Sequence, residues 1–335
     1  MPIIDMHAHV TPERYKKAIA ETGSWYGLDR TVGQIDIGTF ADGVDQRLAG
    51  MDADGVDMQL LSPNVGFYQY FNDLDTTKAI ARECNDEVAE MVVERPERFA
   101  GIGTLPMQDV PSAIAELERC MGELGLKGAI INDSAAGETY DDLKFLPFFK
   151  AAEDMGAILL FHQGGGTIVE QRIERYKLGN SVGNLTERAL VFGALVYGGV
   201  MDKCPGLKAL LAHGGGVTPY CAVRMDKASG ALDRTSPNEA LTPRFDRLPG
   251  EHFELTNAPS DYLDRFHYDC CTYSGATLRF LVDAVGIDQV VLGTDTPAPM
   301  VLPDPVNWIR SLDVLTEVEK EAILITNPMA LMGMN

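Results

Sequence analysis

Residues 3–9 read Ile-Ile-Asp-Met-His-Ala-His, a short apolar run that ends in two histidines separated by one residue. In an extended strand, side chains two residues apart point to the same face, so His7 and His9 can reach one common point. Similar short apolar runs recur along the chain, with helical segments between them. This alternation is typical of a parallel sheet with crossover helices.

Eight of these runs are predicted to be strands. They cover residues 3–7, 57–62, 100–105, 128–132, 157–162, 208–213, 266–271 and 289–295. Between two of them, Ile80, Cys84, Val88 and Met91 fall on one helical face. Eight strand–helix units in 335 residues favour a closed (β/α)8 barrel, the TIM barrel, over an open doubly wound sheet.

Two long polar stretches, residues 11–45 and 229–265, do not fit a plain barrel. Both are rich in Gly, Pro and Asp. We expect them to be insertions after strands one and six, on the face where barrels build their active sites. The sequence has no internal repeat, low-complexity tract or Pro-rich linker. We therefore predict a single domain over residues 1–335.

The composition is that of a folded globular protein, with 45% hydrophobic and 8% aromatic residues. Acidic residues outnumber basic ones 49 to 28, which argues against nucleic acid or an anionic membrane as a partner. No signal-peptide pattern is visible, and no apolar run approaches the roughly 20 residues of a membrane helix. The six cysteines lack CxxC spacing and are predicted to be reduced thiols, so we expect a cytoplasmic protein.

Three more polar residues end the predicted strands five, six and eight, namely His162, His213 and Asp295. The carboxyl ends of barrel strands converge on one mouth, so these side chains are expected to meet the two histidines of the first strand. Imidazoles and a carboxylate suit Zn²⁺ or another divalent transition metal with an open position. Each residue alone has an ordinary explanation, such as a core histidine or a helix cap. Five of them at strand ends favour a metal site.

Longer motifs surround these residues. They are Ile-Asp-Met-His-Ala-His at 4–9, Arg-Leu-Ala-Gly-Met-Asp at 47–52, Arg-Phe-Ala-Gly-Ile-Gly-Thr-Leu-Pro-Met-Gln at 98–108, Ala-His-Gly-Gly-Gly at 212–216 and Leu-Gly-Thr-Asp at 292–295. With them the chain resembles the decarboxylase branch of the amidohydrolase superfamily, and within it the 2-amino-3-carboxymuconate-6-semialdehyde decarboxylases. The resemblance runs through most of the chain.

The resemblance implies a role for each residue of the metal site. On the family's pattern, His7, His9, His162 and Asp295 hold one divalent ion per subunit. Zn²⁺ is the expected metal, and Mn²⁺ is the alternative. His213 is the implied acid/base, and Asp295 takes part in the chemistry as well as in metal binding.

The resemblance also implies an anion clamp made of Arg47 and Arg224. A guanidinium grips a carboxylate through two parallel hydrogen bonds, which suits both arginines to binding a carboxylate substrate. On the family's pattern, Arg224 reaches into the site of the neighbouring subunit. A homodimer is therefore the expected active unit.

Two departures from the family concern the substrate pocket. The decarboxylases that the chain resembles have Pro-Trp after the strand-five histidine, whereas this chain has Gln-Gly-Gly-Gly at 163–166. Thr296 stands where an aromatic residue commonly follows the aspartate. In the seventh predicted strand, alternation places Asp269 on the same face as His267 and Cys271, so Asp269 is expected at the barrel mouth.

These observations predict a metal-dependent, non-oxidative decarboxylase of a small aromatic or unsaturated carboxylic acid. The same residues would also serve the hydrolysis of a cyclic amide, a lactone or a C–C bond, or a hydration, and the metal ligands do not separate these reactions. A third hypothesis is a barrel that only binds partners. Loss of a ligand or of His213 would have favoured it, and all five residues are present.

Overall fold

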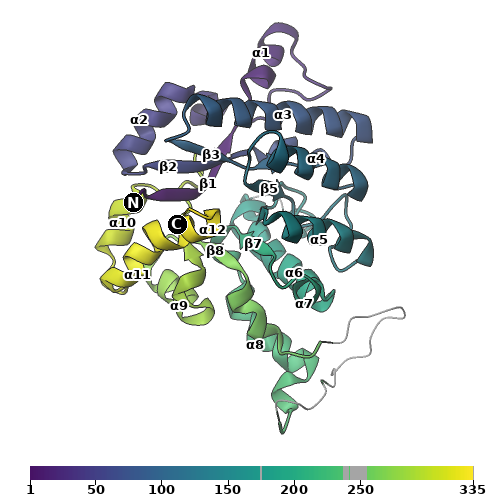
Figure 1. Ribbon diagram of the computed structural model, residues 1–335, viewed down its shortest axis with the longest axis vertical. Helices are drawn as coiled ribbons and strands as arrows, with labels where there is room; N and C mark the ends of the chain where they lie inside the picture. The colour runs from purple at the N-terminus through teal and green to yellow at the C-terminus, as the bar shows by residue number, and fades with distance from the viewer. Residues whose placement is uncertain (174–175, 237–240, 242–254, 335) are drawn as a thin grey trace.

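The computed structural model describes residues 1–173, 176–236, 241 and 255–334. Strands occur at all eight predicted places, and helices surround them (Figure 1). The strands are β1 (Ile4–Val10), β2 (Met58–Pro63), β3 (Phe99–Gly101), β4 (Gly103–Thr104), β5 (Gly128–Ile131), β6 (Ile158–Phe161), β7 (Lys208–Leu211), β8 (His267–Asp269) and β9 (Val290–Val291). All paired neighbours are parallel and follow the order of the chain.

The third predicted strand is interrupted at one residue. Its two halves, β3 and β4, pair with β2 and β5 respectively. Ile102 lies between the halves, and its backbone N–H donates to the carbonyl of Leu61 at 2.8 Å. Because β3 and β4 are two halves of one barrel strand, the nine labelled strands correspond to the eight strands of the predicted barrel.

Backbone hydrogen bonds also join the first strand of the barrel, β1, to the last, which contains β9. The N–H of Met6 donates to the carbonyl of Leu292 at 2.9 Å, and the N–H of Asp295 donates to the carbonyl of His7 at 2.9 Å. These bonds complete the ring, so the parallel sheet closes as a (β/α)8 barrel. Closure brings the carboxyl ends of β1 and β9 next to each other.

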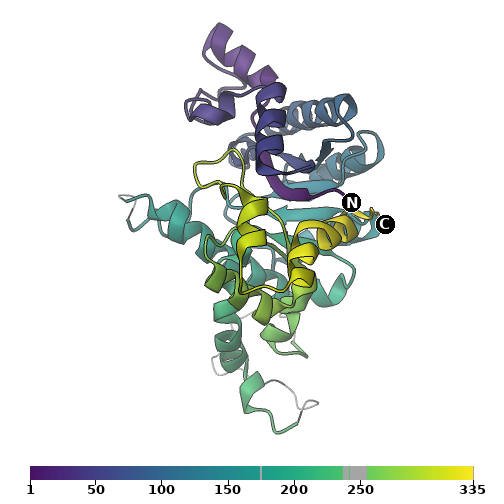
Figure 2. The same ribbon diagram turned by 90° about the vertical axis from the view of Figure 1, so that its left-hand side faces the viewer.

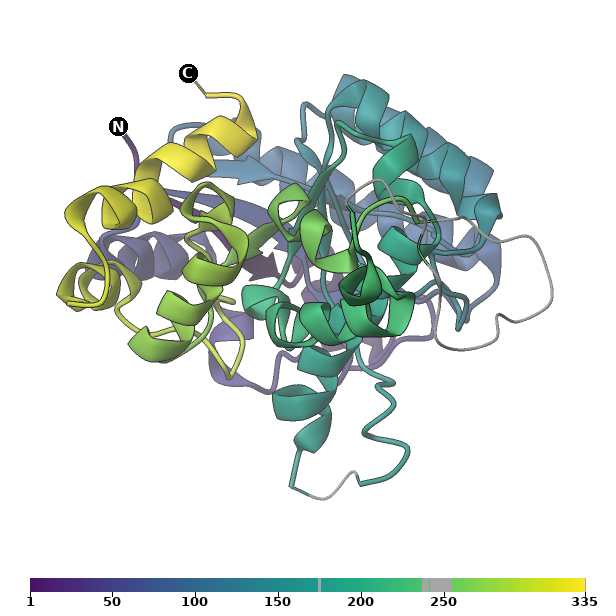
Figure 3. The same cartoon turned by 90° about the horizontal axis from the view of Figure 1, so that it is seen from below.

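The helices form the outer layer, as Figures 1 and 3 show. They are α1 (Glu13–Thr22), α2 (Val44–Asp54), α3 (Leu74–Glu94), α4 (Val110–Gly122), α5 (Leu146–Met155), α6 (Asn184–Tyr197), α7 (Val200–Lys203), α8 (Thr218–Ser229), α9 (Gly275–Val285), α10 (Pro305–Ser311), α11 (Glu317–Glu321) and α12 (Asn327–Met332). On α3, three residues of the predicted inner face, Ile80, Cys84 and Val88, are fully buried, and the fourth, Met91, is half-buried against the core. In the described part of the chain, no helix has the length and apolarity needed to cross a membrane.

The first predicted insertion, residues 11–45, contains α1 and a short 3-10 helix at Gly38–Ala41, and α1 projects from one end of the barrel (Figures 1 and 2). Tyr15, Trp25 and Phe67 pack edge to face in a small separate core that holds this insertion. In the second predicted insertion, residues 237–240 and 242–254 lie outside the described residues. A third projecting segment was not predicted, and it runs between β6 and α6 (Figure 2).

The cysteines are as predicted. All six are unpaired, and five of them are buried. The thiols of Cys270 and Cys271 both donate hydrogen bonds to the carbonyl of Gly293.

The barrel wall has no room for a side chain at Gly128, the first residue of β5. A Cβ there would lie 1.9 Å from the backbone carbonyl oxygen of Ile158 on the paired strand β6, and φ is +151°. We expect Gly128→Ala to lower the free energy of unfolding by about 3 kcal/mol or more, because neither strand can move without breaking its pairing. The midpoint of urea unfolding, followed by circular dichroism, measures the loss.

The matched control is Gly122→Ala, at the end of α4, where a Cβ meets no atom within 4 Å. In this helical position alanine should leave the stability unchanged or raise it by roughly 0.5–1 kcal/mol. Equal midpoints for the two variants would contradict the proposed close contact of β5 and β6.

Candidate metal centre

The structure brings together the four residues that the sequence analysis assigned as metal ligands. His7 and His9 lie inside β1, His162 directly follows β6, and Asp295 follows β9. All four are buried, and one ligand atom from each lies within 4.8 Å of the others. Strand β1 runs to Val10, three residues beyond its predicted end, so both histidines lie within the strand, although its register against β2 shifts between Asp5 and Ala8.

The distances show how tightly these atoms converge. The Nε2 atoms of His7 and His9 are 3.1 Å apart. From Oδ1 of Asp295, Nε2 of His9 lies at 3.2 Å and Nε2 of His7 at 3.4 Å. Nε2 of His162 lies at 3.8 Å from the same oxygen. One carboxylate oxygen thus faces three imidazole nitrogens around a common centre.

The other nitrogen of each ring is held by an outer group. The partners of the three Nδ1 atoms are the carboxylate of Asp269 at 2.7 Å from His7, the hydroxyl of Ser62 at 3.0 Å from His9, and the carbonyl of Gln163 at 3.0 Å from His162. Among the described residues, the buried Nε2 of His162 has no hydrogen-bond partner. Rings fixed through Nδ1 with Nε2 turned inward are typical of metal-ligating histidines, so these residues fit a divalent metal.

Charges and burial set different pKa values for the four residues. Burial is the largest effect at His9 and His162, and it lowers the pKa of both, that of His162 well below the ordinary value. At His7, burial is outweighed by the hydrogen bond to Asp269 and by nearby carboxylates, which raise its pKa above 6.5. At Asp295, burial is likewise outweighed by hydrogen bonds to histidines, which hold its pKa well below the usual range.

The predicted acid/base, His213, stands beside this centre. It follows β7, and its Nε2 lies 3.6 Å from Oδ2 of Asp295, the carboxylate oxygen that the three histidine ligands leave free. Its backbone has a positive φ of 58°, which directs the chain into a tight turn through the next glycines. The imidazole of His213 packs against the ligand rings, with its ring centroid 4.7 Å from that of His162 and 5.5 Å from that of His7.

The metal cluster opens into a small polar pocket of about 220 Å³. The described residues that line it include no lysine or arginine. Its polar side chains are Gln34, Asn64, Gln163, Glu170, Asn180 and Asn184, together with His9, His162, His213 and Asp295. Of these amides only Gln163 was expected near the substrate pocket from the sequence. Asn64 follows the second predicted strand and could have been found from that position, whereas Asn180 and Asn184 carry no such signal.

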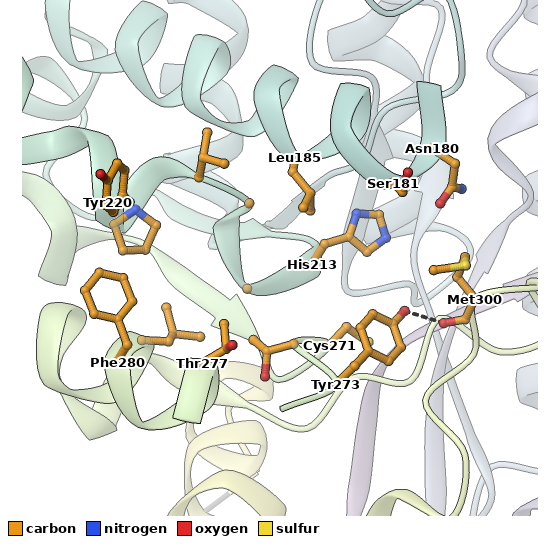
Figure 4. Close-up of a pocket in the computed structure, with 16 residues that line it drawn as sticks. Asn180, Ser181, Leu185, His213, Tyr220, Cys271, Tyr273, Thr277, Phe280 and Met300 are labelled. Atoms are coloured by element: carbon orange, nitrogen blue, oxygen red, sulfur yellow. Dashed lines mark hydrogen bonds between the residues drawn. The ribbon is translucent and has the colours of Figure 1, made fainter. Parts of the chain in front are cut away.

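A second, larger pocket of about 390 Å³ adjoins the first and shares His213 and Asn180 with it. Figure 4 shows Asn180 and Met300 on one side of His213, with Tyr220 and Phe280 on the other. Most of its lining is apolar and comes from α6, α8, α9 and the turns that precede them. His213 thus stands between a polar and an apolar chamber.

The two predicted clamp arginines lie outside the metal pocket. Arg47, on α2, donates hydrogen bonds to the carbonyl of His9 and, at 3.0 Å, to Oε1 of Gln59. Burial lowers its pKa to about 10. Arg47 lines a separate hollow, which shares Ala298 and Pro299 with the metal pocket. Arg224 is exposed on the outside of α8. Their contacts with a substrate stay predictions.

The two departures from the family's pattern also have places in the structure. Gln163 is buried and donates a hydrogen bond to the carbonyl of Gly165, which turns the loop back on itself. A Cβ on Gly164 would lie 2.7 Å from the ring of Tyr68, so this loop packs against that tyrosine without space to spare. Thr296 donates its N–H to the hydroxyl of Thr294. Asp269 lies behind His7 rather than at the open mouth.

Comparison with known proteins places this site in a family. The sequence matches the family described as Amidohydrolase over residues 4–334. It is 31% identical to 2-amino-3-carboxymuconate-6-semialdehyde decarboxylase of Dictyostelium discoideum, over 99% of this chain and 92% of the relative. The structure superposes on 5-carboxyvanillate decarboxylase from Sphingomonas paucimobilis with a TM-score of 0.83 and 27% identity, covering 100% of this chain and 99% of the other.

A second solved structure carries a metal. It is a dihydroxybenzoic acid decarboxylase from Polaromonas sp. with bound manganese and the inhibitor 2-nitroresorcinol. The TM-score is 0.80 and the identity 26%, over 100% of this chain and 97% of the other.

The pKa directions predict how metal binding depends on pH. Below its raised pKa, His7 carries a proton that must leave before a metal binds, whereas His9 and His162 are already neutral. As the pH falls below the pKa of His7, the affinity for Zn²⁺ should therefore fall about tenfold per pH unit. Competition with a chromogenic chelator measures it, and Asp295→Ala, which lacks the carboxylate ligand, should bind no metal.

The outcome that contradicts this assignment is a steeper pH dependence. A loss of about a hundredfold per pH unit would mean that a second histidine is also protonated. Glu118→Gln, an exposed change on α4, is the control and should follow the unmodified protein.

Proposed function

The chain belongs to the amidohydrolase family, and we propose that it is a metal-dependent enzyme that removes the carboxyl group of a small aromatic or unsaturated carboxylic acid without oxidation. One observation carries this proposal. The four proposed ligands converge on one point, and His213 faces the free oxygen of the ligand Asp295 at 3.6 Å. The decarboxylases to which the chain is similar support the reaction type.

We propose Zn²⁺ as the resident metal, held by His7, His9, His162 and Asp295, with Mn²⁺ as the alternative. Three imidazole nitrogens and one carboxylate oxygen are a donor set that suits either ion. When bound, the ion supplies Lewis acidity, which stabilises negative charge that develops on a substrate oxygen. The Nε2 atoms of the histidines and Oδ1 of Asp295 point inward to the centre. The polar pocket lies on the side of this centre from which a substrate would enter.

Loss of carbon dioxide leaves an electron pair on the former carboxyl-bearing carbon, and a proton must replace the carboxyl group. His213 is placed to deliver it, because its ring lines both pockets. The two carboxylate oxygens of Asp295 face different residues. Oδ1 faces the histidine ligands, and Oδ2 lies beside His213, where its charge stabilises the protonated imidazole.

We propose that a second copy of the chain completes the anion site. The metal pocket has no lysine or arginine among its described lining residues, so a substrate carboxylate needs a guanidinium or ammonium partner from elsewhere. On α8, Arg224 is exposed beside Tyr220 and Val223, whose exposed fractions are 79% and 57%. Large apolar side chains left open next to an arginine are typical of an interface. A homodimer would cover this face and supply Arg224 to the partner's site.

Arg47 keeps a proposed role in substrate binding, at the edge of the pocket. Its guanidinium donates a hydrogen bond to the backbone carbonyl of the proposed ligand His9. The six unpaired cysteines suit a reducing compartment, and we propose the cytoplasm as the setting.

The reaction is tested by product mass. The metal-loaded protein is incubated with a panel of aromatic and unsaturated carboxylic acids, lactones and cyclic amides, and the products are analysed by mass spectrometry. We expect a product lighter by carbon dioxide. His213→Ala should lower kcat by about 10²–10⁴-fold, because the proton donor is lost. Glu118→Gln should keep full activity.

A product that has gained water would overturn the decarboxylase assignment for the compound that is converted. It would show instead that the same residues catalyse hydrolysis or hydration. Conversion that persists unchanged in His213→Ala would remove this histidine from the mechanism.

The shared arginine is tested with mixed dimers of two inactive variants, His213→Ala and Arg224→Ala. If Arg224 serves the partner's site, one site of each hybrid dimer has both intact residues. An equal mixture, unfolded and refolded together, should then recover about a quarter of the unmodified activity. No recovery, although hybrids form, would show that Arg224 acts within its own subunit or not at all.

A further inference from the structure

Asp269, the last residue of β8, is a fully buried carboxylate that the proposed reaction does not use directly. Each of its oxygens receives two hydrogen bonds. Oδ2 accepts from Nδ1 of His7 at 2.7 Å and from the backbone N–H of His213 at 2.8 Å. Oδ1 accepts from the N–H of Gly214 at 2.8 Å and from the N–H of Cys271 at 3.0 Å. One side chain therefore contacts both a proposed metal ligand and the backbone of the acid/base.

The backbone around His213 explains why a carboxylate is needed there. His213 and Gly214 both adopt left-handed conformations, with φ of 58° and 61°. This conformation is unfavourable for a residue with a side chain, and it turns successive N–H groups toward the same side. Both N–H groups point at Asp269, whose negative charge stabilises the turn. This backbone turn determines the position of the His213 imidazole.

Packing at the adjoining strand allows the contact with His7. A Cβ on Gly293 would lie 2.7 Å from the Cβ of Asp269 and 2.9 Å from that of His7. Only a glycine at 293 lets these two side chains approach each other. The hydrogen bond between them fixes the ring of His7 with Nε2 toward the centre.

We propose that Asp269 is a positioning residue for two groups at once: it orients the metal ligand His7 and holds the backbone turn that places His213. The second half of this inference rests on the proposed function, in which His213 is the acid/base. The first half rests only on the metal centre.

A second possibility is that Asp269 itself binds a metal, because Nδ1 of His7, a carboxylate oxygen of Asp269 and Sγ of Cys271 also lie within 4.8 Å of one another. The hydrogen bonds argue against it. Both oxygens of Asp269 already accept from N–H groups, and the thiol of Cys271 donates to the carbonyl of Gly293 at 3.0 Å. We therefore expect one metal ion per chain.

The test compares Asp269→Asn, which keeps the shape but removes the charge and one acceptor oxygen, with the unmodified protein. Metal affinity, measured by chelator competition, should fall about 10–100-fold, and the metal content at saturation should stay at one per chain. Hydrogen–deuterium exchange of the peptide that spans residues 208–217 should become faster, because the N–H of His213 or that of Gly214 loses its acceptor oxygen. Neither measurement needs a substrate.

Kinetics then separate positioning from a general structural effect. With metal at saturation, Asp269→Asn should lower kcat by about 10–100-fold with little change in KM. In the His213→Ala background the same change should lower kcat no further, while the loss of metal affinity should persist. Asp109→Asn, a half-buried carboxylate that accepts from the N–H of Ser112 on α4, is the matched control and should change none of these values.

Distinct results overturn distinct parts. Unchanged metal affinity would remove the role at His7, and unchanged exchange or a kcat loss that adds to that of His213→Ala would remove the role at His213. Two metal ions per chain, falling to one in Asp269→Asn, would make Asp269 a ligand instead. If no substrate is decarboxylated, the proposed function fails, while affinity and exchange still decide for or against Asp269.

Discussion

The carboxylate of Asp5 joins β1 to both of its neighbours, and the arrangement of the site depends on this junction. It accepts hydrogen bonds from Gln59 on β2 and from the N–H and hydroxyl of Thr294 beyond β9, at 2.7–3.1 Å. Burial raises the pKa of Asp5 to about 6, so holding it ionised at neutral pH costs stability. This destabilising carboxylate lies where β1 and the segment after β9 close the barrel. His7 and Asp295 each follow within two residues of that junction.

The closed ring explains how so few residues make a reactive site. His7, His162 and Asp295 come from three different barrel strands, yet they meet because closure brings the carboxyl ends of those strands to one mouth. An outer ring of acceptors then fixes each imidazole through Nδ1. The proposed acid/base, His213, has a left-handed backbone, and its ring packs against that of His162 with the centroids 4.7 Å apart. Precision at the centre thus comes from the parts of the chain that are most deeply buried.

The sequence predicts the parts of the site that the barrel geometry dictates. Strand ends are readable from apolar runs, and parallel strands must converge, so the meeting of the two β1 histidines with His162 and Asp295 could be foreseen. The direction of a long side chain could not. Arg47 lies on α2, and its guanidinium turns to the carbonyl of His9. The alternation of side chains in the strand correctly predicts the face on which Asp269 lies. Its contact with His7 depends on the absence of a side chain at Gly293, and no sequence periodicity reveals that.

The placement of two proposed ligands on one strand also shapes how such a protein can change over generations. A one-residue insertion ahead of His7 in β1 would place Met6 and Ala8 where His7 and His9 now stand, and so remove both histidines from the centre together. The loops that follow the barrel strands carry no such penalty, and residues 11–45 show how much chain one of them can hold. Insertions and deletions that leave the metal centre intact are therefore expected mainly in the loops at the rim of the barrel. Substrate preference can drift there while the chemistry at the centre stays constant.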